Sequence, residues 1–200
     1  MILAIDTTHE WGSLALLHDG QLLEEVTLHA PNGFAHLLFP ELSLLLARNL
    51  VELRQIDCFA AANGPGSFTG VRVGLAAVKG LAEAAGRPAV GVSNLAAIAS
   101  FGTRAVRAPV LDARRGEIFG AVYSAEGELL SPEVVMPLDA FLATIPAETE
   151  LVSADEMAIP VTKAPRALAA AVARIAAKGA ATGDPADLDA NYIRRPDIRA

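Results

Sequence analysis

Apolar and polar residues alternate in the same order at two places in the chain. Residues 1–25 (MILAIDTTHEWGSLALLHDGQLLEE) contain a short apolar run, a polar turn and two alternating runs joined by Asp19-Gly20. Residues 108–131 (APVLDARRGEIFGAVYSAEGELLS) repeat this order, with Glu126-Gly127 at the second turn. An acidic residue followed by glycine between alternating runs is typical of a β-hairpin. The sequence therefore predicts two related three-stranded meanders.

Helical periodicity follows each meander. It predicts helices over residues 35–50, 69–86, 94–102, 137–145 and 164–179, and buried strands over residues 56–64, 87–93 and 148–154. Because strands and helices alternate in both parts, we expect an α/β fold with two related halves. The expected division is an N-terminal half, residues 1–102, and an abbreviated C-terminal half, residues 103–200.

The first two predicted helices, residues 35–50 and 69–86, are more apolar than one buried face requires. The polar residues of each fall on one narrow stripe, and Gly70, Gly74 and Gly80 would allow another helix to approach closely. Either the second half of the chain or a partner protein covers the surplus, and the pattern favours a partner. The interface candidates are Leu38, Leu42, Leu45, Leu46, Val71, Leu75 and Val78. Helical spacing alone leaves each of them the alternative of a place in the chain's own core.

The segment NGPGSFTGVRVGL, residues 63–75, joins a predicted strand to a predicted helix. It fits neither the dinucleotide fingerprint G-x-G-x-x-G, nor the phosphate-binding loop G-x-x-x-x-G-K-S/T, nor the G-x-S-x-G turn that carries a catalytic serine. Ser67 or Thr69 is expected to cap the helix, and contact with an anion at that helix start stays open.

Asp6 and Asp112 end the first strands of the two meanders. In a duplicated fold they would face each other across a cleft, where carboxylates can position Mg²⁺ and phosphate. The alternative is that each carboxylate caps its own turn. The residues considered for nucleotide or phosphate contact are Asp6, Thr7, Thr8, Gly66, Ser67 and Asp112. No metal site is expected, because the four histidines form no H-x-x-x-H pair.

Composition narrows the class of protein. With 52% hydrophobic residues among 200, the chain still lacks the run of about 20 apolar residues that a membrane span needs, so a cytoplasmic protein is expected. A single cysteine, Cys58, excludes an internal disulfide. The net charge of −7 argues against a broad nucleic-acid surface, and two local groups of arginines are expected to be solvated surface charge. These groups are Arg104, Arg107, Arg114 and Arg115, and Arg194, Arg195 and Arg199.

Four segments, GPGSFTGVRVGL, PAVGVSNLAAIA, LDARRGEIFGAVY and NYIRR, closely resemble the TsaB (YeaZ) family. The resemblance covers nearly the whole chain and implies an actin-like (ASKHA) fold of two ribonuclease-H-like halves. It implies a non-catalytic subunit that dimerises with TsaD through the first two helices. The complex transfers threonylcarbamoyl to the adenosine beside the anticodon, in tRNAs that read codons beginning with adenine.

The resemblance also implies further partners. These are the ATPase TsaE, tRNA contacted only through the complex, and, for the isolated chain, a homodimer through the same helices as an open alternative. It implies no cofactor for the chain itself, while ATP and Mg²⁺ can act at the level of the complex.

The sequence departs from related proteins at two places. TsaD-like proteins carry metal-binding histidines where this chain has Asn94 and Ile98. Phe34-Ala35 stand where the TsaB family often has His-Ser, which puts any role of that polar pair in doubt. The alternative function is an active ASKHA-type Mg²⁺-dependent ATP hydrolase or kinase that uses Asp6, Thr7, Thr8 and Asp112.

Overall fold

The first half of the chain forms a five-stranded sheet in the order β3-β2-β1-β4-β5. The computed structural model describes residues 1–179 and 183–193. The strands are β1 (Ile2–Asp6), β2 (Trp11–His18), β3 (Gln21–His29), β4 (Cys58–Ala62) and β5 (Ala89–Val92). Strands β1 to β3 form the predicted antiparallel meander, and β4 and β5 extend the sheet in parallel with β1.

The second sheet repeats this arrangement in the order β10-β9-β6-β7-β8. Its strands are β6 (Val106–Arg114), β7 (Glu117–Ser124), β8 (Leu129–Pro137), β9 (Glu150–Ser153) and β10 (Thr162–Lys163). Here too the first three strands form an antiparallel meander, and the last two run parallel to the first. The predicted duplication and the actin-like α/β fold are therefore confirmed.

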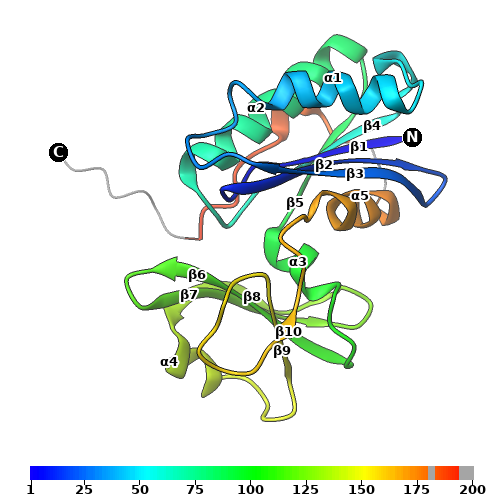
Figure 1. Cartoon of the computed structure of the whole chain (residues 1–200). Coiled ribbons are helices and arrows are strands. Elements are labelled where there is room, and N and C mark those ends of the chain that lie inside the picture. The colour runs from blue at the N-terminus through cyan, green and yellow to red at the C-terminus, as the bar shows by residue number, and fades with distance from the viewer. Residues whose placement is uncertain (180–182, 194–200) are drawn as a thin grey trace.

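Helices cover both faces of the first sheet and separate it from the second (Figure 1). They are α1 (Leu38–Arg48), α2 (Phe68–Ala85), α3 (Asn94–Ala99), α4 (Leu138–Leu142) and α5 (Ala169–Lys178), with short 3₁₀ helices η1 (Leu53–Gln55) and η2 (Pro185–Asp187). Helices α1 and α2 lie on the outer face of the first sheet, and α3 and α5 lie between the two sheets.

Alternation along β1 explains how one strand serves two cores. Leu3 and Ile5 belong to the core beneath α1 and α2, whereas Ala4 between them belongs to the core around α3 and α5. A third, smaller core joins the outer face of the second sheet to Phe141 of α4. Since α5 comes from the second half of the sequence yet packs on β1 and β2, the two halves share the central core. The division at residues 1–102 and 103–200 stays a prediction.

Helix α5 begins later than its sequence pattern predicts. The expected helix covers residues 164–179, whereas α5 starts at Ala169. The cause lies in the first sheet: Ser13 Oγ accepts hydrogen bonds from the Leu168 and Ala169 amides, at 3.0 and 2.9 Å. Glu25 accepts a further one from the Ala170 amide at 2.8 Å. These side chains satisfy amides that a helix start leaves free. Among the described residues, no helix combines the length and hydropathy needed to span a membrane.

Candidate functional site

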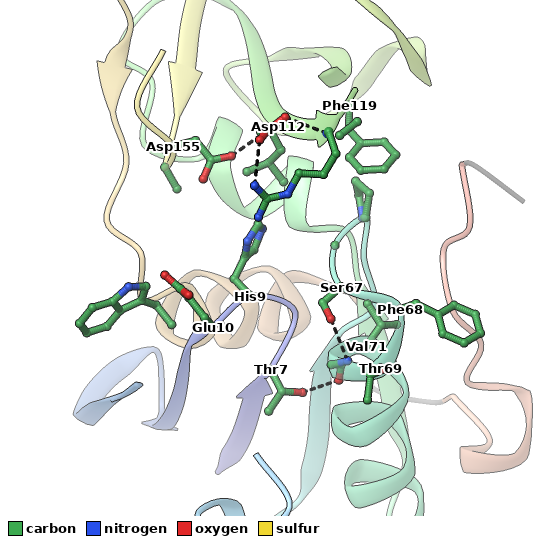
Figure 2. Close-up of a pocket in the computed structure, with 18 of the residues that line it drawn as sticks. Thr7, His9, Glu10, Ser67, Phe68, Thr69, Val71, Asp112, Phe119 and Asp155 are labelled. Carbon is green, nitrogen blue, oxygen red and sulfur yellow. Dashed lines mark hydrogen bonds and ion pairs between the residues drawn. The ribbon is translucent and has the colours of Figure 1, made fainter. Parts of the chain in front are cut away.

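A cleft of about 1460 Å³ opens between the two halves, and its wall is drawn in Figure 2. Thr69, at the start of α2, lines it from the first half, and Asp155, which follows β9, lines it from the second. Of the residues predicted to contact a nucleotide or phosphate, the cleft is lined by Thr7, Gly66, Ser67 and Asp112. Asp6 and Thr8 do not line it; both are buried.

The Asp6 carboxylate is held inside the protein. Its Oδ1 accepts hydrogen bonds from the Thr8 amide at 2.9 Å and from the Thr8 hydroxyl at 2.7 Å. Asn94 in turn donates its side-chain amide to the Thr8 hydroxyl. Burial raises the pKa of the Asp6 carboxyl above its ordinary value, and the two bonds from Thr8 lower that pKa in opposition. Asp6 is therefore a structural acid at the base of a turn.

Asp112 has a different environment. It is exposed at the end of β6, and its Oδ1 accepts a hydrogen bond from the Arg114 amide at 2.8 Å. Its Oδ2 lies 3.5 Å from Arg114 Nη1, and its own amide donates to Asp155 Oδ2 at 2.9 Å. Figure 2 shows the ring of His9 directed toward Asp112 from the other half. Asp112 therefore faces the cleft with a guanidinium already beside it.

The expectation that Asp6 and Asp112 face each other across the cleft is wrong. Of these two acids only Asp112 lines the cleft, because Asp6 is buried, with 1% of its surface exposed. The alternative, that each carboxylate caps its own turn, describes both residues. Asn94 and Ile98, at the positions of the TsaD histidines, are both buried and serve packing and hydrogen bonding. Among residues 1–179 and 183–193, no group of three potential metal ligands occurs.

The glycine-rich segment brings helix α2 against the end of β1. Ser67 is the N-cap of α2, as expected, and accepts a hydrogen bond from the Gly70 amide at 3.3 Å. A Cβ added to Gly70 would lie 2.0 Å from the Thr7 carbonyl oxygen, and one on Gly74 would lie 2.6 Å from the Thr7 hydroxyl. These two glycines therefore permit an internal contact, and the expectation that they admit a partner's helix is corrected. Gly80 has open space around it.

Most of the predicted interface residues belong to the chain's own core. Leu38, Leu42 and Leu45 of α1 point onto the first sheet, and so do Val71, Leu75 and Val78 of α2; all six are buried. Leu46 alone is half-buried. The reason is geometric: each helix is apolar on two faces, and helical spacing does not tell which face meets the sheet.

The second apolar face of these helices is exposed. On α1 the exposed residues are Phe39, Pro40, Ser43, Leu44, Ala47 and Arg48, and Phe39 and Leu44 are each 51% exposed. The one charged residue among them, Arg48, is paired with Glu24 at 2.7 Å. On α2 the exposed residues are the small residues Thr69, Ala76, Gly80 and Ala84 and, on the adjoining strip of the helix, Phe68, Arg72 and Glu83. We call the exposed residues of α1 together with Thr69, Ala76, Gly80 and Ala84 of α2 the α1–α2 face.

The structure also reveals a cluster that sequence reasoning missed. Tyr192, near the end of the described chain, stacks on Phe68 at the start of α2, beside Arg72. The segments GPGSFTGVRVGL and NYIRR pointed to these positions, but nothing in their spacing indicated that they meet. Arg194, Arg195 and Arg199 lie outside the described residues.

Comparison with known proteins gives consistent results. A family model described as "TsaD: tRNA N6-adenosine threonylcarbamoyltransferase" matches residues 29–184. The tRNA threonylcarbamoyladenosine biosynthesis protein TsaB of Escherichia coli is 37% identical over 150 residues, 67% of this chain and 64% of that protein. The TsaB protein of Bacillus subtilis is 32% identical over 138 residues, 68% of this chain and 59% of that protein. The chain thus spans less than two thirds of the length of these curated relatives.

Solved structures agree. A Pseudomonas aeruginosa protein described as similar to peptidase YEAZ superposes with a TM-score of 0.81 and 29% identity, covering 96% of this chain and 99% of that one. YeaZ from Pseudomonas aeruginosa gives a TM-score of 0.74 and 28% identity, covering 94% of this chain and 98% of that one. Together with the family model and the TsaB relatives, these structures show that the chain belongs to the TsaB (YeaZ) family.

Proposed function

We propose that this chain is a non-catalytic subunit in tRNA threonylcarbamoyladenosine biosynthesis that binds a TsaD-family partner through the α1–α2 face. The biosynthetic role is supported by the names of its TsaB relatives. In the proposed complex the partner transfers threonylcarbamoyl to the adenosine beside the anticodon. The chain itself stabilises the active partner, helps to recruit the ATPase TsaE, and meets tRNA through the complex, in the cytoplasm.

The observation that carries this proposal is the outer face of α1. A surface helix normally presents charged and polar residues to water. Here the exposed positions carry Phe39, Leu44 and small residues, and the lone charge belongs to Arg48 at the helix end. Contiguous apolar surface of this kind is typical of protein interfaces. The small exposed residues of α2 beside it favour close packing of a partner's helix against this face.

The non-catalytic part of the proposal rests on the two acids. Asp6 is buried and bonded to Thr8, so its carboxylate is not presented to the cleft. Asp112 is presented, but with Arg114 beside it. Mg²⁺ at a phosphate-binding site is usually held by one or two carboxylates together with the substrate's phosphates, and Asp112, the one of these two acids on the cleft wall, already has the Arg114 guanidinium beside it.

The first test is the mass of the complex in solution. We expect the purified chain and the TsaD-family subunit of the same organism to form a heterodimer that light scattering detects. Absence of any complex would contradict the proposal. A homodimer of the isolated chain through the same face would be displaced by the partner.

The alternative, an ATP hydrolase or kinase, is tested on the isolated chain. We expect no Mg²⁺-dependent ATP turnover above that of a heat-denatured sample. Turnover that Asp112→Ala abolishes, while folding is preserved, would favour the enzyme over the scaffold.

A further inference from the structure

Two segments far apart in sequence meet at the first turn of α2. The ring of Tyr192 stacks on that of Phe68, with centroids 5.6 Å apart and planes inclined by 27°. The Arg72 guanidinium carbon lies 3.9 Å from the centroid of the Phe68 ring. Arg72 Nε also donates a hydrogen bond to the Tyr192 hydroxyl at 3.0 Å. We call these three residues the aromatic–arginine cluster.

The cluster is ordered by its own contacts and yet faces solvent. Phe68 is 42% exposed and Tyr192 is 40% exposed. Two exposed rings and an arginine, held against one another, form a combination that dominates the binding energy of many protein interfaces. Because the three side chains already fix one another, little further side-chain entropy is lost when a partner covers them.

The backbone that carries Tyr192 is tied to both halves of the chain. The Asn191 amide donates to the Asn63 carbonyl oxygen at 2.8 Å, next to the glycine-rich segment. The Asn191 side chain donates to the carboxylate of Glu133 on β8, which also accepts a bond from the Tyr123 hydroxyl at 2.8 Å. Tyr192 is therefore held beside α2 by the hydrogen bonds that its neighbour Asn191 makes with both halves.

We propose that the aromatic–arginine cluster is an anchor for the same TsaD-family partner, so that the C-terminal segment, residues 183–193, is a third element of the binding surface. This inference rests on the proposed function. Phe68 is the first residue of α2, so the cluster continues the α1–α2 face at one end of that helix. The cluster thereby supplies binding energy at the start of α2. The buried leucines and valines of the predicted interface cannot do so, because they pack in the chain's own core.

The charges identify the class of surface that fits. Arg72, Lys79 and the exposed Glu83 lie on the same stripe of α2, so cations outnumber carboxylates there. Within the described ranges neither cation forms an ion pair, and Lys79 donates to the Ala186 carbonyl oxygen at 3.1 Å. A protein surface with carboxylates opposite these cations and an apolar group against the rings would complement them. RNA is less suitable, because the adjoining cleft presents Asp112 and Asp155 and the chain has a net charge of −7.

The test measures the dissociation constant of the full chain with the TsaD-family subunit by titration calorimetry. We expect Phe68→Ala and Tyr192→Ala each to weaken binding about tenfold or more. Arg72→Glu should weaken binding at least as much, because it places a carboxylate opposite the carboxylates expected on the partner. The matched control is Trp11→Ala, which removes another aromatic ring that stacks on a neighbour, His29, at 4.0 Å and lies near an arginine, Arg166. It should leave the affinity within about twofold.

The outcomes separate this inference from the proposed function. If Leu44→Glu abolishes binding while Phe68→Ala, Tyr192→Ala and Arg72→Glu bind like the wild type, the cluster is no anchor and the α1–α2 face stands alone. If the wild-type chain does not bind, both proposals fail. Thermal unfolding of each variant establishes that it is folded, and Tyr192→Phe, which keeps the stacked ring, should bind within a few-fold of wild type. A further control measures whether the free chain binds an anticodon stem-loop RNA. If Phe68→Ala loses RNA binding but keeps its affinity for the partner, the cluster binds RNA and the inference is overturned.

Discussion

Asp6 and Asp112 make the same hydrogen bond at equivalent ends of the two sheets. Asp6 Oδ1 accepts from the amide two residues later at 2.9 Å, and Asp112 Oδ1 does so at 2.8 Å. Their surroundings differ, because Thr8 and Asn94 enclose the first and the cleft exposes the second. Both turns thus contain the same hydrogen bond from amide to carboxylate, but only Asp112 of the two acids lies on the cleft wall.

This difference predicts unequal effects on stability. Asp6→Ala would leave the buried amide and hydroxyl of Thr8 without their acceptor, which costs about 2 kcal/mol. Asp112→Ala, at an exposed turn, should cost less than about 1 kcal/mol. Urea unfolding followed by circular dichroism measures both. Equal losses in the two variants would contradict the structural role assigned to Asp6.

The contact between α2 and β1 predicts opposite outcomes for two glycines of one helix. Gly70→Ala would place a Cβ 2.0 Å from the Thr7 carbonyl oxygen, so we expect a loss of about 3 kcal/mol or failure to fold. Gly80→Ala meets nothing within 4 Å and should stabilise the helix by up to about 1 kcal/mol. Thermal unfolding of the pair decides. A Gly70→Ala variant as stable as the wild type would refute the close approach.

Glu150 predicts loss of stability in acid. Burial raises the pKa of its carboxyl, but bonds from the Thr162 hydroxyl, the Arg104 and Thr103 amides and the Thr103 hydroxyl outweigh burial and hold the pKa at about 2, below the ordinary 4.5. A lowered pKa means that its contribution, on the order of 3 kcal/mol, is complete above pH 4.5 and is lost as the pH falls toward 2.

The test is unfolding free energy measured from about pH 7 to about pH 3. Glu150→Gln should be less stable than the wild type at neutral pH, and the gap should narrow below pH 4.5. Glu156→Gln, an exposed carboxyl beside Lys163, is the control and should change the profile little. If the difference in unfolding free energy between the wild type and Glu150→Gln stays constant with pH, the lowered pKa of Glu150 is contradicted.

The sequence was sufficient to predict both meanders, the duplication and the bounds of α2 to within a residue. The helix caps explain the last success: Ser67 starts α2, and Gly86 ends it with a φ of 61°. The start of α5 could not be predicted, because it depends on Ser13 and Glu25, which lie far away in sequence. The same limit affected the site. Which apolar face of α1 is inner depends on how the helix rests on the sheet, so the predicted interface residues include the buried Leu38 and not the exposed Leu44.

The burial of Leu75 determines the choice of variant for the partner interface. A charge at Leu75, 6% exposed, would disrupt the core and unfold the protein for reasons unrelated to binding. Leu44, 51% exposed, accepts a charge without core damage, and Leu130 on β8, 54% exposed, offers a matched position in the other half. Both substitutions place a glutamate at a half-exposed leucine, one on the α1–α2 face and one on β8 in the other half.

The most direct measurement is therefore the affinity of Leu44→Glu and of Leu130→Glu for the TsaD-family subunit, each compared with the wild type by titration calorimetry. The α1–α2 interface predicts that Leu44→Glu weakens binding by about a hundredfold or more, because a charge is buried against an apolar surface. Leu130→Glu should bind like the wild type. Undiminished binding by a folded Leu44→Glu variant would contradict the claim that this face holds the partner.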